Sequence, residues 1–84
     1  MSIYTMIEKG KDADGLVLHD VKRDGIMILA DAGYSAVLQL VEHEIKPGDI
    51  YQECVGDSAP YCIQTYDRFQ DEVELSRKFG AGEA

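Results

Sequence analysis

The apolar residues of this chain come in short runs that alternate with turns containing glycine or proline. Runs of this length, rich in β-branched and aromatic residues, are typical of β-strands. We expect five strands, at residues 2–7, 16–21, 26–30, 50–55 and 61–66. The second and third are joined by Lys22-Arg23-Asp24-Gly25, a sequence that favours a tight turn and therefore a β-hairpin.

For two of these strands, the sequence also predicts the position in the sheet. Residues 26–30 read Ile-Met-Ile-Leu-Ala and are apolar on both faces, which is typical of a central strand covered on both sides. Residues 2–7, Ser-Ile-Tyr-Thr-Met-Ile, are rich in β-forming residues and are expected to form an edge strand.

Residues 34–45 show the spacing of an amphipathic helix rather than strict alternation. The apolar positions that carry this pattern are Tyr34, Val37, Leu38, Val41 and Ile45. We predict a helix here. A long strand that ends in a turn at Pro47-Gly48 is the alternative that the sequence leaves open.

A second helix is predicted after the last strand. Asp67 is placed as its N-cap, with Gln70 as the second half of a capping box, and the helix is expected to end near Phe79 with Gly80 as its stop. Residues 80–84 are then expected to form a flexible tail.

These segments predict a small α+β fold. A chain of 84 residues is long enough for one domain and too short for two, and we place that domain at residues 1–79. Its expected architecture is a mainly antiparallel sheet of four to five strands with one or two helices packed on it, in the order β-β-β-α-β-β-α.

The negative charge is concentrated in the middle of the chain. The net charge is −8, and residues 24–67 alone hold eight acids against the single base Lys46, a balance of −7. We expect one side of the folded domain to be distinctly negative, which opposes direct binding to nucleic acid or to an anionic membrane. No run approaches the roughly 20 apolar residues of a membrane span, and the first nine residues lack the pattern of a secretion signal, so a cytoplasmic location is expected.

The sequence offers little for catalysis or metal binding. Cys54 and Cys62 are expected on facing strands, placed symmetrically so that they could lie opposite each other, either as reduced thiols or as a cross-strand disulfide. Their spacing is far from that of zinc ribbons, and no known spacing joins them to His19 or His43. We therefore predict no metal, no cofactor and no catalytic residue.

The residues most suited to contact a partner are tyrosines and acids near the fourth and fifth predicted strands. Tyrosine is enriched in interfaces because it offers a large rigid ring with a polar tip, and acids beside it would attract lysine and arginine. The predicted partner-binding residues are Glu42, Glu44, Asp49, Tyr51, Glu53, Asp57, Tyr61 and Tyr66.

The functional prediction is a small acidic protein that binds a basic protein and does not catalyse a reaction. An inhibitor or adaptor of this kind could act as a nucleic-acid mimic, with carboxylates in the place of phosphates, and small acidic proteins of that type are often encoded by phages or other mobile elements. The alternative is a homodimeric module that binds a small ligand or has a structural role, with residues 26–30 and 34–45 as its interface.

Overall fold

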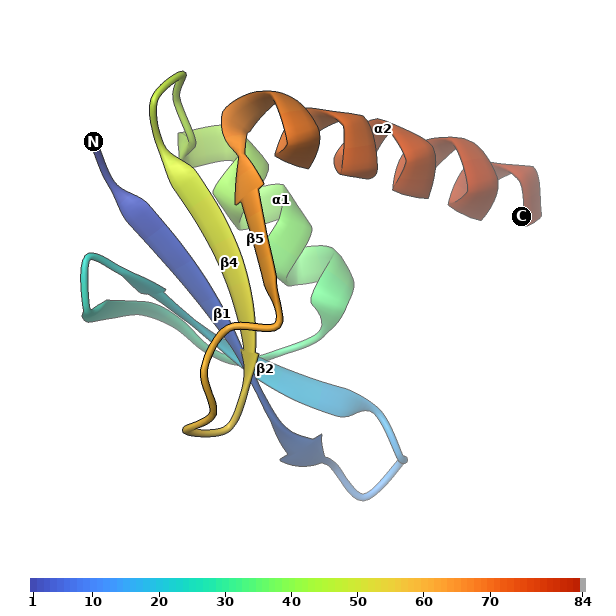
Figure 1. The fold of residues 1–84 in the computed structure, drawn as a ribbon. Coiled ribbons are helices and arrows are strands. Elements are labelled where there is room, and N and C mark those ends of the chain that lie inside the picture. Colours follow the sequence, from blue (N-terminus) through green and yellow to red (C-terminus); the bar gives the residue numbers. More distant parts are fainter. Residues whose placement is uncertain (84) are drawn as a thin grey trace.

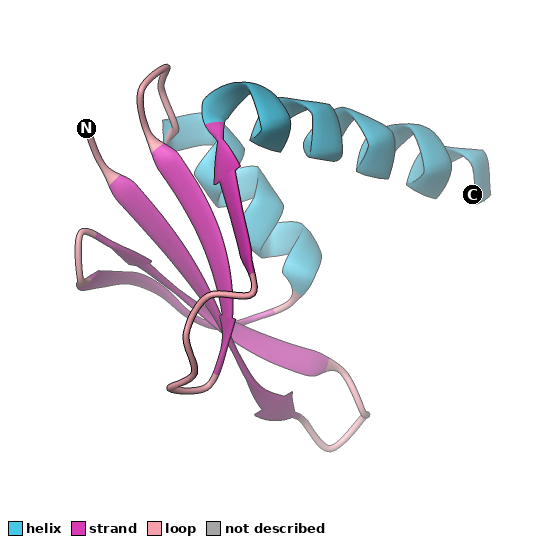
Figure 2. Cartoon of the chain, in the orientation of Figure 1, coloured by secondary structure: helices cyan, strands magenta, loops and turns pink. Residues whose placement is uncertain are grey.

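Five strands form one sheet, and two helices cover one of its faces (Figures 1 and 2). The computed structural model describes residues 1–83, with side chains described as far as residue 78. The elements are β1 (Ile3–Lys11), β2 (Val17–Arg23), β3 (Ile26–Ala32), α1 (Tyr34–Glu44), β4 (Ile50–Val55), β5 (Cys62–Thr65) and α2 (Tyr66–Glu83). The predicted fold class and element order are confirmed, and the helix interpretation of residues 34–45 is correct.

The strand order in the sheet is β3-β2-β1-β4-β5. Antiparallel pairs join β1 to β2, β2 to β3 and β4 to β5, whereas β1 and β4 are parallel. The parallel pair arises because α1 carries the chain back over the sheet, so that β4 adds to the free edge of β1 and not to β3.

This crossover overturns both expectations about strand position. β1 is the central strand and not an edge strand, while β3 lies at one edge of the sheet. The apolar residues of β3 are correspondingly open, with Ile26 70% and Met27 47% exposed. The two apolar faces of a strand are buried only where other elements pack on both faces of the sheet at that strand, and the strand's own sequence does not contain that information.

Two turns form where their sequences favour them: the predicted hairpin turn after β2, and a turn at Pro47-Gly48, which belonged to the strand alternative for residues 34–45. Asp24 and Gly25 connect β2 to β3 with positive φ angles of 52° and 84°, the combination that a two-residue hairpin turn needs. At the end of α1, the N–H of Asp49 donates to the carbonyl of Lys46 at 3.0 Å, and Gly48 has a φ of 97°. Pro47-Gly48 thus occupies the centre of a type II turn.

The core lies between the sheet and the two helices. Its members are Tyr4, Met6, Val21, Val37, Leu38, Val41, Ile45, Tyr51, Phe69 and Val73. The ring of Tyr51 packs against that of Phe69 with centroids 4.6 Å apart, a distance at which aromatic pairs are stabilising. Among the described side chains of α2, Phe69 and Val73 belong to this core and Tyr66 packs against it, and Figure 1 shows the helix crossing the end of β5 and projecting beyond the sheet.

The boundaries of α2 differ from those predicted. The helix begins at Tyr66, directly after β5, so Asp67 lies in its first turn and is not its N-cap. It continues through Gly80 to Glu83, because a glycine in a helix costs only about 1 kcal/mol and does not compel an end. The flexible tail at residues 80–84 stays a prediction, and Ala84 lies outside the described residues.

None of the helices within residues 1–83 combines the length and the apolar character needed to cross a membrane.

Candidate functional site

Both predicted acidic residues on α1 are engaged in ion pairs. Glu42 pairs with Arg77 of α2, and Glu44 pairs with Arg23 of β2 at 2.6 Å. The arginines neutralise these glutamates and tie α1 to its neighbours. The two carboxylates are therefore less suited to a basic partner than their place in the sequence indicated.

Asp49 has a local structural role. Its carboxylate accepts hydrogen bonds from the backbone N–H of Ser2 at 2.8 Å and of Lys46 at 3.0 Å. These two donors lower the pKa of Asp49 below its ordinary value. The side chain is buried and fixes the turn before β4 to the start of the chain.

Tyr51 and Glu53 share one face of β4, as predicted, but that face is the inner one. Tyr51 is fully buried and Glu53 is 6% exposed, so the expectation that they form an exposed surface is wrong. Alternation along a strand places residues two apart on one face. It does not determine which face the helices cover.

The inner face of the sheet instead holds a buried cluster of tyrosines and carboxylates. The hydroxyls of Tyr51 and Tyr34 lie 2.6 and 2.8 Å from the same carboxylate oxygen of Glu53. The hydroxyl of Tyr34 also lies 3.3 Å from Glu72 of α2. Because a hydroxyl carries one hydrogen, Tyr34 can donate to only one of these carboxylates at a time.

Burial and negative charge make both tyrosines harder to ionise. Burial, followed by the hydrogen bond to Glu53 and its charge, raises the pKa of Tyr51 far above its ordinary value of 10.0. The same causes raise the pKa of Tyr34. Both hydroxyls therefore remain protonated donors at neutral pH, which is what a buried carboxylate requires.

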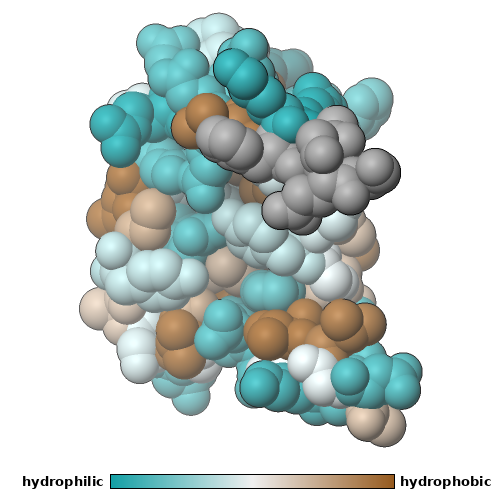
Figure 3. All heavy atoms as spheres, turned by 90° about the vertical axis from the view of Figure 1, so that its right-hand side faces the viewer, coloured by the Kyte–Doolittle hydropathy of each residue, from teal (hydrophilic) through white to brown (hydrophobic). Residues whose placement is uncertain are grey.

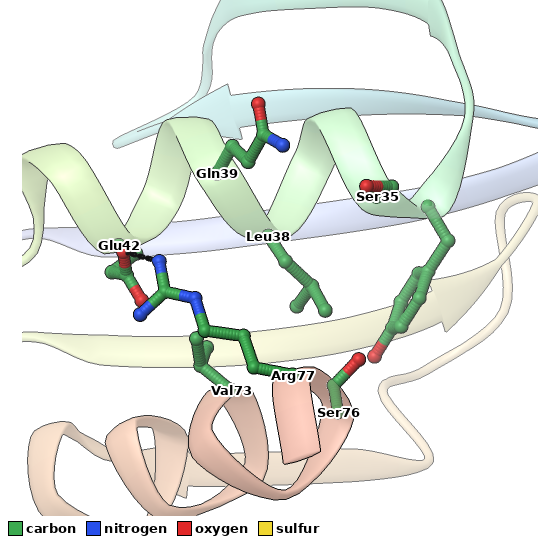
Figure 4. A pocket seen from close by; sticks show the side chains of 8 residues that line it. Ser35, Leu38, Gln39, Glu42, Val73, Ser76 and Arg77 are labelled. Carbon is green, nitrogen blue, oxygen red and sulfur yellow. Dashed lines mark hydrogen bonds and ion pairs between the residues drawn. The ribbon is translucent and has the colours of Figure 1, made fainter. Parts of the chain in front are cut away.

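A cleft of about 320 Å³ lies between α1 and α2, beside this cluster (Figure 4). Leu38 and Val73 supply its apolar lining, Tyr34 also lines it, and Ser76 lies at one end. At the other end the ion pair between Glu42 and Arg77 spans the two helices (Figure 4). The cleft lies at the lower end of the volumes typical of ligand sites.

The exposed part of the predicted surface is the β4–β5 hairpin. Three large apolar side chains are open to solvent there: Val55 is 48%, Tyr61 60% and Ile63 65% exposed. Asp57 is exposed in the same loop. The pKa of Tyr61 is raised, first by partial burial and then by the charges of Glu53 and Glu8, so its hydroxyl lies in negative surroundings.

The last predicted residue, Tyr66, opens α2 and is half-buried against the core. It is not part of the hairpin surface. Of the eight predicted residues, therefore, only Asp57 and Tyr61 are exposed on the same loop.

The prediction missed the exposed acids of α2. Asp67, Asp71 and Glu74 are all exposed, and their spacing of four and three residues places them on one side of the helix. The nearby bases Arg68 and Lys78 hid this pattern in the net charge of the segment. Helical spacing, rather than a charge sum, was the signal that could have found it.

The cysteines are free and do not face each other. Cys62 pairs with Glu53, not with Cys54, so the two thiols lie on opposite faces of the hairpin. The prediction that they could lie opposite one another is wrong, because the loop shifts the register by one residue. Among the side chains that the structure describes, no three His, Cys, Asp or Glu residues come together as metal ligands.

The histidines lie apart from each other. His19 is buried, and its Nδ1 lies 3.1 Å from the carbonyl oxygen of Ala32, to which it donates. His43 is exposed on α1.

In Figure 3, which looks onto the side toward which α2 projects, hydrophilic residues predominate and the hydrophobic ones form separate areas.

Comparison of the chain with protein families, curated proteins and solved structures found no match.

Proposed function

We propose that this protein is a non-catalytic binding protein that docks its acidic surface on a basic region of another protein, as an inhibitor or adaptor. The observation that carries the proposal is the β4–β5 hairpin, where Val55, Tyr61 and Ile63 are roughly half or more exposed beside Asp57. Several exposed apolar side chains within one hairpin make it a candidate interaction site, and tyrosine is frequent among the residues that dominate binding energy.

The charge of the molecule gives this surface its selectivity. The net charge is −8, and no ion pair joins Asp57 to a base within the described residues. A basic partner would be attracted at long range and held by contacts with the hairpin. One form of the function is competition with nucleic acid for a basic groove, with carboxylates in the place of phosphates.

We place this function in the cytoplasm. The free thiols of Cys54 and Cys62 agree with a reducing compartment, although their place on opposite faces of the hairpin is enough to keep them unlinked.

The test is a pull-down with the tagged protein from a lysate, washed at low and at high salt. The expected result is a basic protein that is retained at low salt and released at high salt. Asp57→Lys and Tyr61→Ala are expected to weaken its capture. Asp14→Lys is the matched control, because Asp14 is an exposed acid in the β1–β2 loop and its replacement changes the net charge equally. Equal losses from Asp57→Lys and Asp14→Lys would contradict a role for the hairpin.

Glu53, one of the predicted partner-binding residues, is unsuitable for charge reversal in this test. Glu53 is 6% exposed and accepts two tyrosine hydroxyls. A lysine there would leave a buried cation beside two donors, and loss of binding would then report unfolding.

A homodimeric module is the second candidate, favoured by one observation. β3 lies at the edge of the sheet with Ile26 and Met27 exposed, and two copies could cover these side chains by packing against each other. The apolar side of α1 is already used by the core, so the interface would involve β3 alone. Sedimentation equilibrium distinguishes the candidates: a dimer would persist at high salt and dissociate on Met27→Lys.

A further inference from the structure

The free edge of β5 and the flank of α2 form a groove of about 320 Å³. Its lining residues are Gln64, Arg68, Asp71, Glu72 and Leu75. β5 pairs with β4 on one side and with no other strand of the described residues, so backbone N–H and C=O groups on its other side are free to pair. We propose that this groove binds an extended basic segment of the partner protein, which adds to β5 as a sixth strand. This inference rests on the proposed function and specifies the partner's binding segment.

The opposite edge of the sheet is less suited to strand addition. β3 pairs with β2 through an irregular register, with shifts between His19 and Val21 and between Val21 and Lys22. Asp31 of β3 has a positive φ of 53° and is held by Lys9 at 2.6 Å. Bulges and charges of this kind protect an edge from pairing. The register between β4 and β5 is regular over all four pairs.

The chemistry of the groove calls for a donor. The side-chain oxygen of Gln64 is buried and accepts no hydrogen bond from any described residue. Its amide nitrogen donates to Glu72. Exchanging the amide oxygen and nitrogen would place the oxygen against the Glu72 carboxylate and would leave the nitrogen as the buried atom without a partner. The lining also holds the two carboxylates of Asp71 and Glu72 against the single cation Arg68, a balance that favours lysine or arginine.

The geometry of the edge also specifies a sequence pattern for the segment. Along β5, Gln64 faces α2, whereas Ile63 lies on the opposite face of the sheet and is 65% exposed. Side chains of an added strand alternate in the same way. Residues beside Gln64 would therefore be basic, and those beside Ile63 would be apolar.

The experiment uses the whole protein and a synthetic peptide, acetyl-Lys-Val-Lys-Val-Lys-Val-amide, monitored by NMR. We expect binding that slows hydrogen exchange of amides in Cys62–Thr65. A peptide of the same composition with the lysines and valines in two blocks should bind more weakly. Methylation of the peptide backbone nitrogens should reduce affinity at least about tenfold, since two or more backbone hydrogen bonds are lost.

Two single substitutions on α2 are expected to act in opposite directions. Asp71→Asn should weaken binding and Arg68→Ala should strengthen it, each about two- to fivefold, the range of an exposed charge pair. Asp14→Asn and Lys11→Ala are the matched controls, since both residues are exposed on the β1–β2 side and lie outside the groove.

Each contrary outcome has a distinct meaning. If the methylated peptide binds as well as the parent, strand addition is refuted and acidic docking stands. If no peptide binds, although the pull-down yields a basic partner sensitive to Asp57→Lys, the groove is refuted and the hairpin remains the docking site. Protection of β5 that increases with protein concentration in the absence of peptide would show that a second copy occupies the edge, which also overturns the proposal. A pull-down without a salt-sensitive partner removes the proposed function itself.

Discussion

Replacement of Tyr51 by phenylalanine isolates the contribution of one buried hydroxyl. The ring stays in contact with Phe69, at a centroid distance of 4.6 Å, and no atom of Tyr51 is exposed, so apolar packing is preserved. What is lost is the 2.6 Å hydrogen bond to Glu53. A hydrogen bond to a charged group contributes about 1.5–3 kcal/mol, and we expect Tyr51→Phe to lower the free energy of unfolding by that amount.

The second donor in the cluster makes this prediction sharper. Tyr34 is half-buried and divides its hydroxyl between Glu53 and Glu72, so Tyr34→Phe should cost less, about 1 kcal/mol. The double variant leaves the carboxylate of Glu53 without either hydroxyl. Its cost should exceed the sum of the single losses by about 0.5–3 kcal/mol.

Urea unfolding followed by circular dichroism measures these differences from the midpoints at constant slope. Tyr61→Phe is the control, because the residue is 60% exposed and its change should stay within about 0.5 kcal/mol. The reasoning is refuted if Tyr51→Phe has as small an effect as this control, or if the losses for Tyr51 and Tyr34 are strictly additive.

The same cluster predicts how stability depends on alkaline pH. Folding raises the pKa of Tyr51 and Tyr34 above the ordinary value of 10.0, so their contribution is fully present below pH 10 and is lost as the pH rises above it. In that range the unfolded chain releases both protons and the folded protein retains them. The free energy of unfolding should therefore fall by about 2.7 kcal/mol per pH unit from these two groups, at about 1.36 kcal/mol each. Urea titrations above pH 10 should show a slope reduced by about 1.36 kcal/mol per pH unit in Tyr51→Phe, and an unchanged slope would contradict the burial of this hydroxyl as a protonated donor.

Three further changes test the turn, the core and the hairpin register. Gly25→Ala should cost about 1–2 kcal/mol in urea unfolding, because Gly25 has a φ of 84° and a side chain is disfavoured there. Met6→Ala should cost about 2–5 kcal/mol in the same assay, since Met6 is 1% exposed at the centre of the sheet; a smaller loss would place Met6 outside the core. Mild oxidation of the folded protein should leave Cys54 and Cys62 unlinked within one chain, because they lie on opposite faces of the hairpin, and non-reducing mass spectrometry that found this bridge would contradict the register.

Only part of the candidate site could be predicted from the sequence. Exposure of Asp57 and Tyr61 follows from their place in a polar loop, where side chains usually meet solvent. The burial of Glu53 was not predictable, because its donor Tyr34 lies 19 residues before it in the sequence, and Glu72, the second acceptor beside the Tyr34 hydroxyl, lies 19 residues after it. Only the packing of α1 and α2 on the same face brings these groups together.

Local sequence determined the elements and their order. The helical spacing of apolar residues from Tyr34 to Ile45, and the short apolar runs of the strands, act within a few residues and need no distant partner. The turns at Asp24-Gly25 and Pro47-Gly48 are equally local, since they depend on the φ angles that these residues adopt. Each of these features is present in the structure.

Tertiary structure decided which strand is central, which face is buried and which acids remain free. β1 became central because α1 returns the chain to its open edge, a matter of connection and not of composition. Arg23 and Arg77 neutralise Glu44 and Glu42 from distant elements, which leaves the hairpin and α2 as the acidic surfaces. The physical reason is that hydrophobic burial and ion pairing act between whichever surfaces meet in space, while strand and helix patterns record only the preferences of neighbouring residues.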